Sequence, residues 1–313
     1  MHLNTILCMK NERVKRNMSL KVKSGNNRSL LEQVKDPSIL VIPGVYDPLT
    51  ARIAENCGFP AILAGGYAVS ATYLGLPDME MITPTEMLDT VRRIRAVVDL
   101  PIVADIDTGG GALLNIRRLI KGMELAGASG IQIEDQFFPK RAGLTEGRQV
   151  IKPEDMVMRL KAVTDARTSD LLIIARTDAE DLSDAIDRAN LYYEHGADVL
   201  FIEDIHDRES MDRVVKEVQG PTLAVMVEGS GYPFLSIPEL EEVGFDVVYY
   251  CNSAMYAATY AAKMALQELK KTGTTKGIMD KMISFKDFNE LIGFDELRRL
   301  QIEYEKVKET LIK

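Results

Sequence analysis

The fold of this chain is decided by a stretch that recurs along it, first as Cys57-Gly58-Phe59-Pro60-Ala61-Ile62-Leu63. A helical pattern ends at a glycine, and an apolar run begins two or three residues later. The arrangement returns at residues 126–133, 195–201 and 243–249. Glycine just beyond a helix is the expected left-handed stop. A short apolar run is typical of a strand buried on both faces of a parallel sheet, so the pattern predicts alternating helices and parallel strands.

Counting such runs outward from this stretch predicts eight strands, at residues 39–45, 60–64, 101–105, 130–134, 171–176, 198–203, 221–227 and 246–251. Helical patterns lie between them, for example at 85–98, 153–167 and 184–195. Eight strand–helix units in about 230 residues indicate an α/β fold, a closed (β/α)8 barrel of the TIM type. The alternative is a doubly wound open sheet. That fold usually has fewer units and often carries a glycine-rich turn after its first strand, which this sequence lacks.

The two ends of the chain depart from the repeat. Residues 1–28 are polar and basic, and we expect a flexible tail there, with a targeting segment as the alternative. From residue 29 to 313 we expect one barrel domain, extended from about residue 275 by apolar-patterned helices at 278–283 and 288–313. Helices that follow a complete barrel cannot join its wall. We therefore expect them to pack outside it or on a partner subunit.

Composition narrows the class of function. The 313 residues are 46% hydrophobic and 27% charged, as in a soluble globular protein. A net charge of −9 argues against a general nucleic-acid-binding surface, and no apolar run is long enough to predict a membrane span. Three distant cysteines form neither a disulfide framework nor a zinc pattern, which fits a reducing, cytoplasmic location. Cys57 and Cys251 are expected to pack in or near the core.

Charged side chains follow five of the eight predicted strands, at the rim where barrels of this type carry their active sites. In chain order they include Asp105, Asp107, Glu134, Arg176, Glu203 and Glu228. Like charges at this spacing repel one another unless a cation offsets them. We therefore expect a bound divalent ion. Hard carboxylate oxygens suit Mg²⁺, with Mn²⁺ as the alternative.

The most informative pair of acids stands at the end of the third of the eight predicted strands. Asp105 and Asp107 are two residues apart, so in an extended segment both side chains point to the same face. The alternative is that they cap the following helix. Three glycines at 109–111 argue against capping, because they open space for a ligand to approach.

Three further features of the rim each allow two interpretations. Arg176 either binds a carboxylate or phosphonate in bidentate fashion or forms an internal ion pair with Glu134 or Asp178. The long polar segment 136–150 is either a lid or simply mobile, and its place over the rim favours a lid. The tyrosines at 249–250 close the last strand, where they either line the pocket or pack the barrel.

Four motifs occur in register along the barrel pattern. They read Gly75-Leu76-Pro77-Asp78, Asp105-Ile106-Asp107-Thr108-Gly109-Gly110-Gly111, Ile133-Glu134-Asp135-Gln136 with Pro139-Lys140-Arg141, and Ile174-Ala175-Arg176-Thr177-Asp178-Ala179. Their order and spacing resemble the isocitrate lyase/phosphoenolpyruvate mutase superfamily across roughly residues 38–300. The nearest branch holds 2-methylisocitrate lyase, 2,3-dimethylmalate lyase and carboxyphosphonoenolpyruvate mutase.

This resemblance implies a barrel whose eighth helix is exchanged between paired subunits of a homotetramer, a dimer of dimers. It also implies Mg²⁺ bound directly by Asp105, with the other acids acting mostly through water, and backbone amides at Gly66 and Tyr67 that bind the substrate carboxylate. The expected residues are, for the metal, Asp105, Asp107, Glu134 and Asp78; for catalysis, Asp78, Lys140, Arg176 and Glu203; and for substrate binding, Gly66, Tyr67, Arg176, Glu203 and Glu228.

Two departures from the superfamily pattern bear on the reaction. Its lyases carry Lys-Arg-Cys-Gly-His in the mobile loop, where the Cys gives or takes a proton. Here the same positions read Lys140-Arg141-Ala142-Gly143-Leu144, and a methyl group cannot transfer a proton. A superfamily Asn on the seventh strand aligns with Val225, which removes a hydrogen bond to the substrate.

Together the residues favour a Mg²⁺-dependent carbon–carbon lyase acting on a small 2-hydroxy or 2-oxo di- or tricarboxylic acid. Cleavage would be retro-aldol or decarboxylative, through a metal-bound enolate. The enzyme alternatives are a phosphonopyruvate or carboxyphosphonoenolpyruvate mutase or hydrolase, and an oxaloacetate decarboxylase, which also works without the loop Cys. The non-enzyme alternative is a catalytically lapsed binding barrel, which Ala142, Leu144 and Val225 support.

Overall fold

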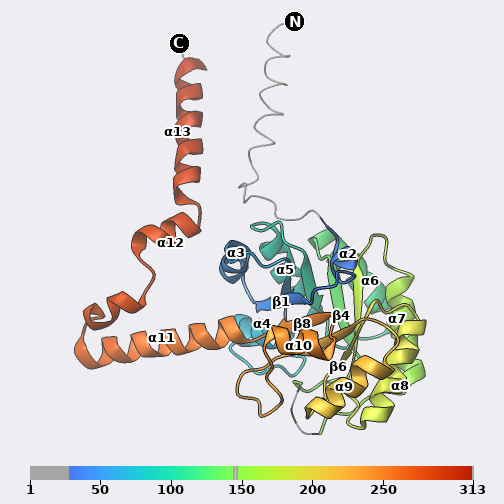
Figure 1. Cartoon of the computed structure of the whole chain (residues 1–313). Coiled ribbons are helices and arrows are strands. Elements are labelled where there is room, and N and C mark those ends of the chain that lie inside the picture. The colour runs from blue at the N-terminus through green and yellow to red at the C-terminus, as the bar shows by residue number, and fades with distance from the viewer. Residues whose placement is uncertain (1–27, 144, 146, 312–313) are drawn as a thin grey trace, which may run out of the picture. The chain divides into compact units, whose positions relative to one another are not determined.

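Eight parallel strands form a closed barrel in the computed structural model, which describes residues 28–143, 145 and 147–311 (Figure 1). Each strand pairs with the next along the chain, and β8 pairs with β1. The strands are β1 (Leu40–Val45), β2 (Ile62–Ala64), β3 (Ile102–Asp105), β4 (Gly130–Glu134), β5 (Leu172–Thr177), β6 (Val199–Ile202), β7 (Thr222–Val225) and β8 (Val247–Tyr250). The predicted fold class is confirmed, and the predicted strand bounds differ from these by at most about two residues.

Helices alternate with the strands, as the glycine-terminated pattern predicts. Gly127 and Gly244 end their helices in the left-handed conformation, with φ of 92° and 105°. The helices between Leu30 and Val243 are α2 (Leu30–Gln33), α3 (Pro48–Asn56), α4 (Gly66–Val69), α5 (Pro84–Arg95), α6 (Leu113–Ala126), α7 (Pro153–Thr164), α8 (Leu182–Glu194), α9 (Arg208–Glu217) and α10 (Ile237–Val243), with a π-helical turn η1 (Ser70–Leu74) after α4.

Apolar side chains fill the inside of the barrel, below the rim that carries the charged residues. Ile42, Leu63, Ile174 and Phe201 belong to one buried cluster of inward-facing residues. A second cluster fills the space between the strands and the helices around them. A barrel packed in this way is a core rather than a pore, so ligands can bind only at its mouth.

Beyond β8 the chain continues through α11 (Ser253–Thr272), a 3₁₀ helix η2 (Lys276–Lys281), α12 (Phe285–Leu291) and α13 (Phe294–Leu311). The expected C-terminal helices are therefore present, although the first is a 3₁₀ turn and the second is divided near residue 293. Residues 26–261 form one compact unit, and residues from 262 onward belong to a second. Apart from Arg28, the predicted basic tail lies outside the described residues. Within the described part of the chain, no helix is both long and apolar enough to cross a membrane.

Candidate active site

The acids predicted for a metal meet at the carboxyl ends of β3 and β4. Asp105, Asp107 and Glu134 each offer an oxygen atom that lies within 4.8 Å of the others. All three side chains are buried, and neither carboxylate oxygen of Glu134 has a hydrogen-bond partner. Burial raises the pKa of Asp107 to about 7 and that of Glu134 well above its usual value. The cluster therefore has the oxygen ligands and the excess negative charge that a divalent cation offsets.

Asp105 and Asp107 converge through a turn rather than through the extended segment that we expected. β3 ends at Asp105, and Asp107 has a positive φ of 51°. The backbone N–H of Asp107 donates to Asp105 Oδ1 at 3.2 Å, and that of Gly66 donates to Asp105 Oδ2 at 3.1 Å. The capping alternative is wrong, because α6 begins only at Leu113 and Ala112 is its N-cap.

The glycines after Asp107 have a packing role besides the one we expected. A Cβ on Gly109 would lie 2.7 Å from the side chain of Ile116, and one on Gly110 would lie 2.4 Å from that of Pro84. Both residues have positive φ, which also favours glycine. These two glycines thus let the turn pack against α5 and α6, and Gly110 also lines a second cavity beside Asp105 and Asp107.

Lys140 supplies the positive charge that faces these acids. Its Nζ lies 2.6 Å from Asp107 Oδ1 and 2.8 Å from Asp78 Oδ2, and both the lysine and Asp78 are buried. Burial disfavours the charged lysine, but Asp107 and Glu134 together with the other nearby carboxylates raise its pKa well above the usual value. We call this group the acidic half of the site; it comprises Asp78, Asp105, Asp107, Glu134 and Lys140.

Arg176, at the end of β5, forms the internal ion pair that was one of its two interpretations. Its Nε and Nη2 donate to the two oxygens of Asp178 at 2.9 and 2.7 Å. Glu134 and Glu203 each lie 3.6 Å from the guanidinium group. Burial raises the pKa of Glu203, although Arg176 opposes that rise. Because the guanidinium group also lines the cavity described below, the ion pair and ligand binding are compatible.

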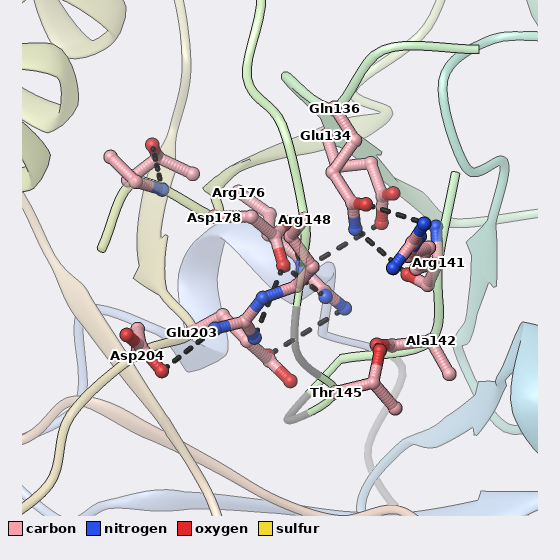
Figure 2. Close-up of polar contacts among 12 residues, drawn as sticks. Glu134, Gln136, Arg141, Ala142, Thr145, Arg148, Arg176, Asp178, Glu203 and Asp204 are labelled. Carbon is pink, nitrogen blue, oxygen red and sulfur yellow. Dashed lines mark hydrogen bonds and ion pairs between the residues drawn. The ribbon is translucent and has the colours of Figure 1, made fainter. Parts of the chain in front are cut away.

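Arg148 is a buried cation that the sequence did not single out. Its Nη2 donates to Asp204 Oδ1 at 2.8 Å, and its Nη1 lies 3.7 Å from Asp178 Oδ1. Figure 2 shows the guanidinium groups of Arg148 and Arg176 side by side among these carboxylates. Residue 148 stood in the predicted polar loop, but nothing in the sequence separates it from Arg141 there, which is exposed. The arginine half of the site comprises Arg148, Arg176, Asp178, Glu203 and Asp204.

A cavity of about 270 Å³ opens between the two halves. Of the predicted site residues, those that line it are Gly66, Tyr67, Asp78, Asp105, Arg176, Glu203 and Glu228. Val225 and Val227 form an apolar wall after β7. Ser253 donates a short hydrogen bond to one oxygen of Glu228, whose other oxygen has no partner. The predicted residues thus share one site, although Asp107, Glu134 and Lys140 lie behind its lining.

Strand β8 resolves the two interpretations of its tyrosines. Tyr249 is buried inside the barrel and lines the cavity, whereas the Tyr250 hydroxyl donates to the Leu235 carbonyl on the outer side of the strand. Cys251 follows on the inner side and also lines the cavity. Cys57 is exposed, so its predicted place in the core is wrong.

The segment after β4 folds over the cavity. Gln136 and Val150 form an isolated antiparallel bridge at its base, and Gln136 also bonds the backbone of Arg141 (Figure 2). Ala142, Gly143 and Thr145 line the cavity, while Leu144 lies outside the described residues. A Cβ on Gly143 would lie 1.9 Å from Glu203 Oε1. Glycine at this position therefore allows the loop to press directly against the arginine half.

Comparison with known proteins places this geometry in a family. Residues 30–270 match the phosphoenolpyruvate phosphomutase family. The chain belongs to that family. It is 38% identical over 277 residues to 2,3-dimethylmalate lyase of Eubacterium barkeri, covering 87% of this chain and 96% of the relative. It is 37% identical to a 2-methylisocitrate lyase of Aeropyrum pernix, covering 90% of this chain and 92% of that protein.

Solved structures of the same superfamily have the same fold. Oxaloacetate acetylhydrolase in complex with 3,3-difluorooxalacetate superposes with a TM-score of 0.84 at 27% identity, covering 88% of this chain and 96% of that one. A 2,3-dimethylmalate lyase superposes with a TM-score of 0.82 at 31% identity, over 88% of this chain and 94% of that one. The resemblance to the isocitrate lyase/phosphoenolpyruvate mutase superfamily is confirmed, and with it the prediction of an enzyme.

Proposed function

We propose that this family member is a Mg²⁺-dependent carbon–carbon lyase acting on a small 2-hydroxy or 2-oxo carboxylic acid. The observation that carries the proposal is the buried acidic half beside an arginine-lined cavity. Four carboxylates there face one ammonium group, and both oxygens of Glu134 lack a hydrogen bond. A buried excess of negative charge is unfavourable unless a cation joins it.

The donor set fits Mg²⁺ in chemistry and in spacing. We propose that Asp105 is the direct ligand and that Asp78, Asp107 and Glu134 hold the water molecules around the ion, with Mn²⁺ as a substitute. An ion held there would supply positive charge to the oxygen on which negative charge develops during cleavage. Lys140 keeps Asp78 and Asp107 in place through its two ion pairs.

The substrate carboxylate has a binding place between β2 and β5. Arg176 presents the face of its guanidinium group that Asp178 leaves free, and we propose that it pairs with the carboxylate. The backbone at Gly66 and Tyr67 lines the opposite side. The Gly66 N–H is engaged by Asp105 Oδ2, so its proposed role requires that bond to lengthen when ligands bind. We propose that Glu203 faces the substrate hydroxyl and that Glu228 contacts the polar groups of the part that leaves.

We prefer carbon–carbon cleavage over phosphorus–carbon chemistry because one wall of the cavity is apolar. Val225 and Val227 offer methyl groups, and a phosphonate group would need donors where these side chains stand. The named lyases among the relatives act on alkyl-substituted acids, which such a wall accommodates. Decarboxylation of oxaloacetate uses the same charge stabilisation and stays within the proposal.

A substrate panel tests this function. Purified full-length protein is incubated with 2,3-dimethylmalate, 2-methylisocitrate, oxaloacetate and phosphonopyruvate, with Mg²⁺ or with EDTA, and products are followed by NMR. We expect Mg²⁺-dependent release of a 2-oxo acid from at least one of the first three. Turnover of phosphonopyruvate alone, or equal rates in EDTA, would contradict the proposal.

The surface of the barrel supports a proposal of self-association. An apolar groove of about 640 Å³ lies beside α3 and α10 and is lined by residues such as Leu49, Ile53, Phe59 and Ile237. We propose that the C-terminal helices of a second copy cover it in a homo-oligomer, a dimer of dimers, and light scattering measures the mass directly. Both described cysteines are free thiols, which suits the proposed cytoplasmic location.

A further inference from the structure

Carbon–carbon cleavage, the proposed function on which the following rests, needs a proton donor. The bond's electron pair remains on a carbon atom, which must gain a proton to form a stable product. The loop over the cavity offers a methyl group at Ala142 and a bare backbone at Gly143. Neither can give a proton at neutral pH. Among the described residues, we therefore expect the donor on the walls of the cavity.

Most hydroxyl groups of the described cavity lining are already engaged. Thr145 Oγ1 donates to the Ala142 carbonyl, and Ser230 Oγ donates to the Val227 carbonyl at 2.9 Å. The hydroxyl of Tyr256 is hydrogen-bonded to Tyr67. Two further proton-bearing groups of the described lining lie on the inner face of β8 and just beyond it, at Tyr249 and Cys251.

These two groups serve different parts of the cavity. The phenol of Tyr249 is 1% exposed and has no hydrogen-bond partner, and the charge that acts on it most is that of Asp105. Tyr249 therefore belongs to the acidic half. The charges that act on the Cys251 thiol are those of Glu203, Glu228 and Arg176. That is the side on which the leaving carbon lies if the oxo acid product stays with the acids.

The position of Cys251 is fixed tightly by its neighbours. A Cβ on Gly44 would lie 1.9 Å from the Cys251 carbonyl oxygen, so β1 approaches this residue as closely as glycine allows. The residue also packs against the inward-facing cluster of the barrel. Burial raises the pKa of the thiol to about 12, with Glu203 adding to the shift. A thiol held in this way carries its proton at neutral pH, and the residue lines the cavity.

We propose that Cys251 protonates the carbon atom released by cleavage, and that Glu203 accepts the proton of the substrate hydroxyl. The O–H electron pair becomes part of the new C=O bond, and the broken C–C bond leaves its pair on the departing carbon. That carbon takes the proton of the Cys251 S–H bond, whose electron pair stays on sulfur. Glu203 then returns its proton to the thiolate, directly or through water, so no proton is consumed. Arg176 faces the thiolate while it exists.

The test uses the full-length protein and a panel substrate that the wild type cleaves. We expect Cys251→Ala and Cys251→Ser to lower kcat about 10²- to 10⁴-fold, with KM little changed. Cys251→Ser nearly conserves volume and decides the matter if the alanine variant fails to fold. Cys57→Ser is the matched control, because that thiol is exposed and outside the cavity. Calorimetric binding of oxalate with Mg²⁺ confirms that each variant keeps its site.

A stereochemical readout separates a proton donor from a structural residue. With 2,3-dimethylmalate in D₂O, the wild type should place one deuterium on a single face of the propionate carbon. The residual turnover of the Cys251 variants should give both configurations, because solvent then protonates the carbon. Unchanged kcat and stereochemistry in both variants would overturn the proposal. So would loss of the stereospecific label in Tyr249→Phe but not in the Cys251 variants. A wild type that cleaves no carbon–carbon substrate instead contradicts the proposed function, and the assignment of Cys251 fails with it.

Discussion

The acidic half and the arginine half of the site are built on neighbouring strands but differ in charge balance. In the acidic half, four carboxylates face the single ammonium group of Lys140. In the arginine half, three carboxylates face the two guanidinium groups of Arg148 and Arg176. The first half has three more carboxylates than cations, whereas the second has only one more. A metal site and a preformed carboxylate site differ in just this way.

The halves also differ in how far they keep to the superfamily pattern. The acidic half retains every carboxylate that the resemblance implies. The departures lie on the other side of the cavity, where Ala142 and Val225 replace a proton-transferring and a hydrogen-bonding side chain. Charge stabilisation is therefore preserved while the contacts to the leaving part of the substrate have changed. Under the proposed function, this chain would differ from its relatives in substrate and proton path and would keep the metal-dependent step.

Of the variants that compare the two halves, Asp105→Ala in the acidic half should have the largest effect. We expect metal-dependent turnover to fall about 10³-fold, since several kcal/mol of charge stabilisation is lost. Calorimetry should show that Mg²⁺ with oxalate no longer binds. Asp212→Ala, which removes an exposed acid paired with Arg208, is the control and should change neither quantity. Turnover retained in Asp105→Ala would mean that the acidic half is only structural.

The arginine half should respond in stability as well as in rate. Arg176→Lys keeps the charge but loses the planar fork, and we expect kcat/KM to fall about 10²-fold. Arg176→Ala leaves Asp178 and Glu203 buried without their partner, which should lower the free energy of unfolding by about 3–5 kcal/mol. Urea unfolding measures this loss. Arg213→Lys, in an exposed pair with Glu217, should change stability by less than about 0.5 kcal/mol. Equal losses of stability in the Arg176 and Arg213 variants would show that the buried ion pair contributes no more than the exposed one.

The sequence predicted the barrel well because its fold depends on local patterns. Each strand is a short apolar run, and glycines such as Gly127 and Gly244 end the preceding helices in a conformation that favours glycine. Seven of the ten predicted site residues also line one cavity, since the carboxyl ends of parallel strands meet at one rim. Both successes need only the order of elements along the chain.

What the sequence did not predict depends on contacts between distant residues. The turn that brings Asp107 back to Asp105 and the packing of Gly110 against Pro84 arise only when α5 and β3 are neighbours. Arg148 is buried because Asp204, 56 positions away, accepts its hydrogen bond. Cys251 lines the cavity where Gly44 of β1 approaches its carbonyl oxygen, a close contact that no local pattern shows.

Val225→Asn should change the substrate preference that the apolar wall of the cavity sets. Asparagine would place a donor and an acceptor where the wall is apolar, next to the inner face of β8. We expect kcat/KM for 2-methylisocitrate to rise relative to 2,3-dimethylmalate by about 10-fold, because the extra carboxylate gains a hydrogen-bond partner. Val225→Thr, with a hydroxyl but nearly the same shape, is the matched control for a polar group alone. An unchanged ratio in both variants would show that the wall does not select the substrate.

The smallest effect is the pH dependence of stability that Asp107 should cause when no metal is bound. Because burial raises the pKa of Asp107 from its ordinary value of 3.8 to about 7, the folded protein binds this proton more tightly than the unfolded chain. The stability that results is present below about pH 4 and is lost as the pH rises towards 7. In EDTA, we therefore expect the free energy of unfolding to fall between pH 6 and 7 by about 1 kcal/mol more in the wild type than in Asp107→Asn. Mg²⁺ should reverse the loss in the wild type, because it binds the ionised carboxylates. Equal slopes in the two proteins, measured by urea unfolding, would show that Asp107 is ionised without a metal and that Lys140 alone balances its charge.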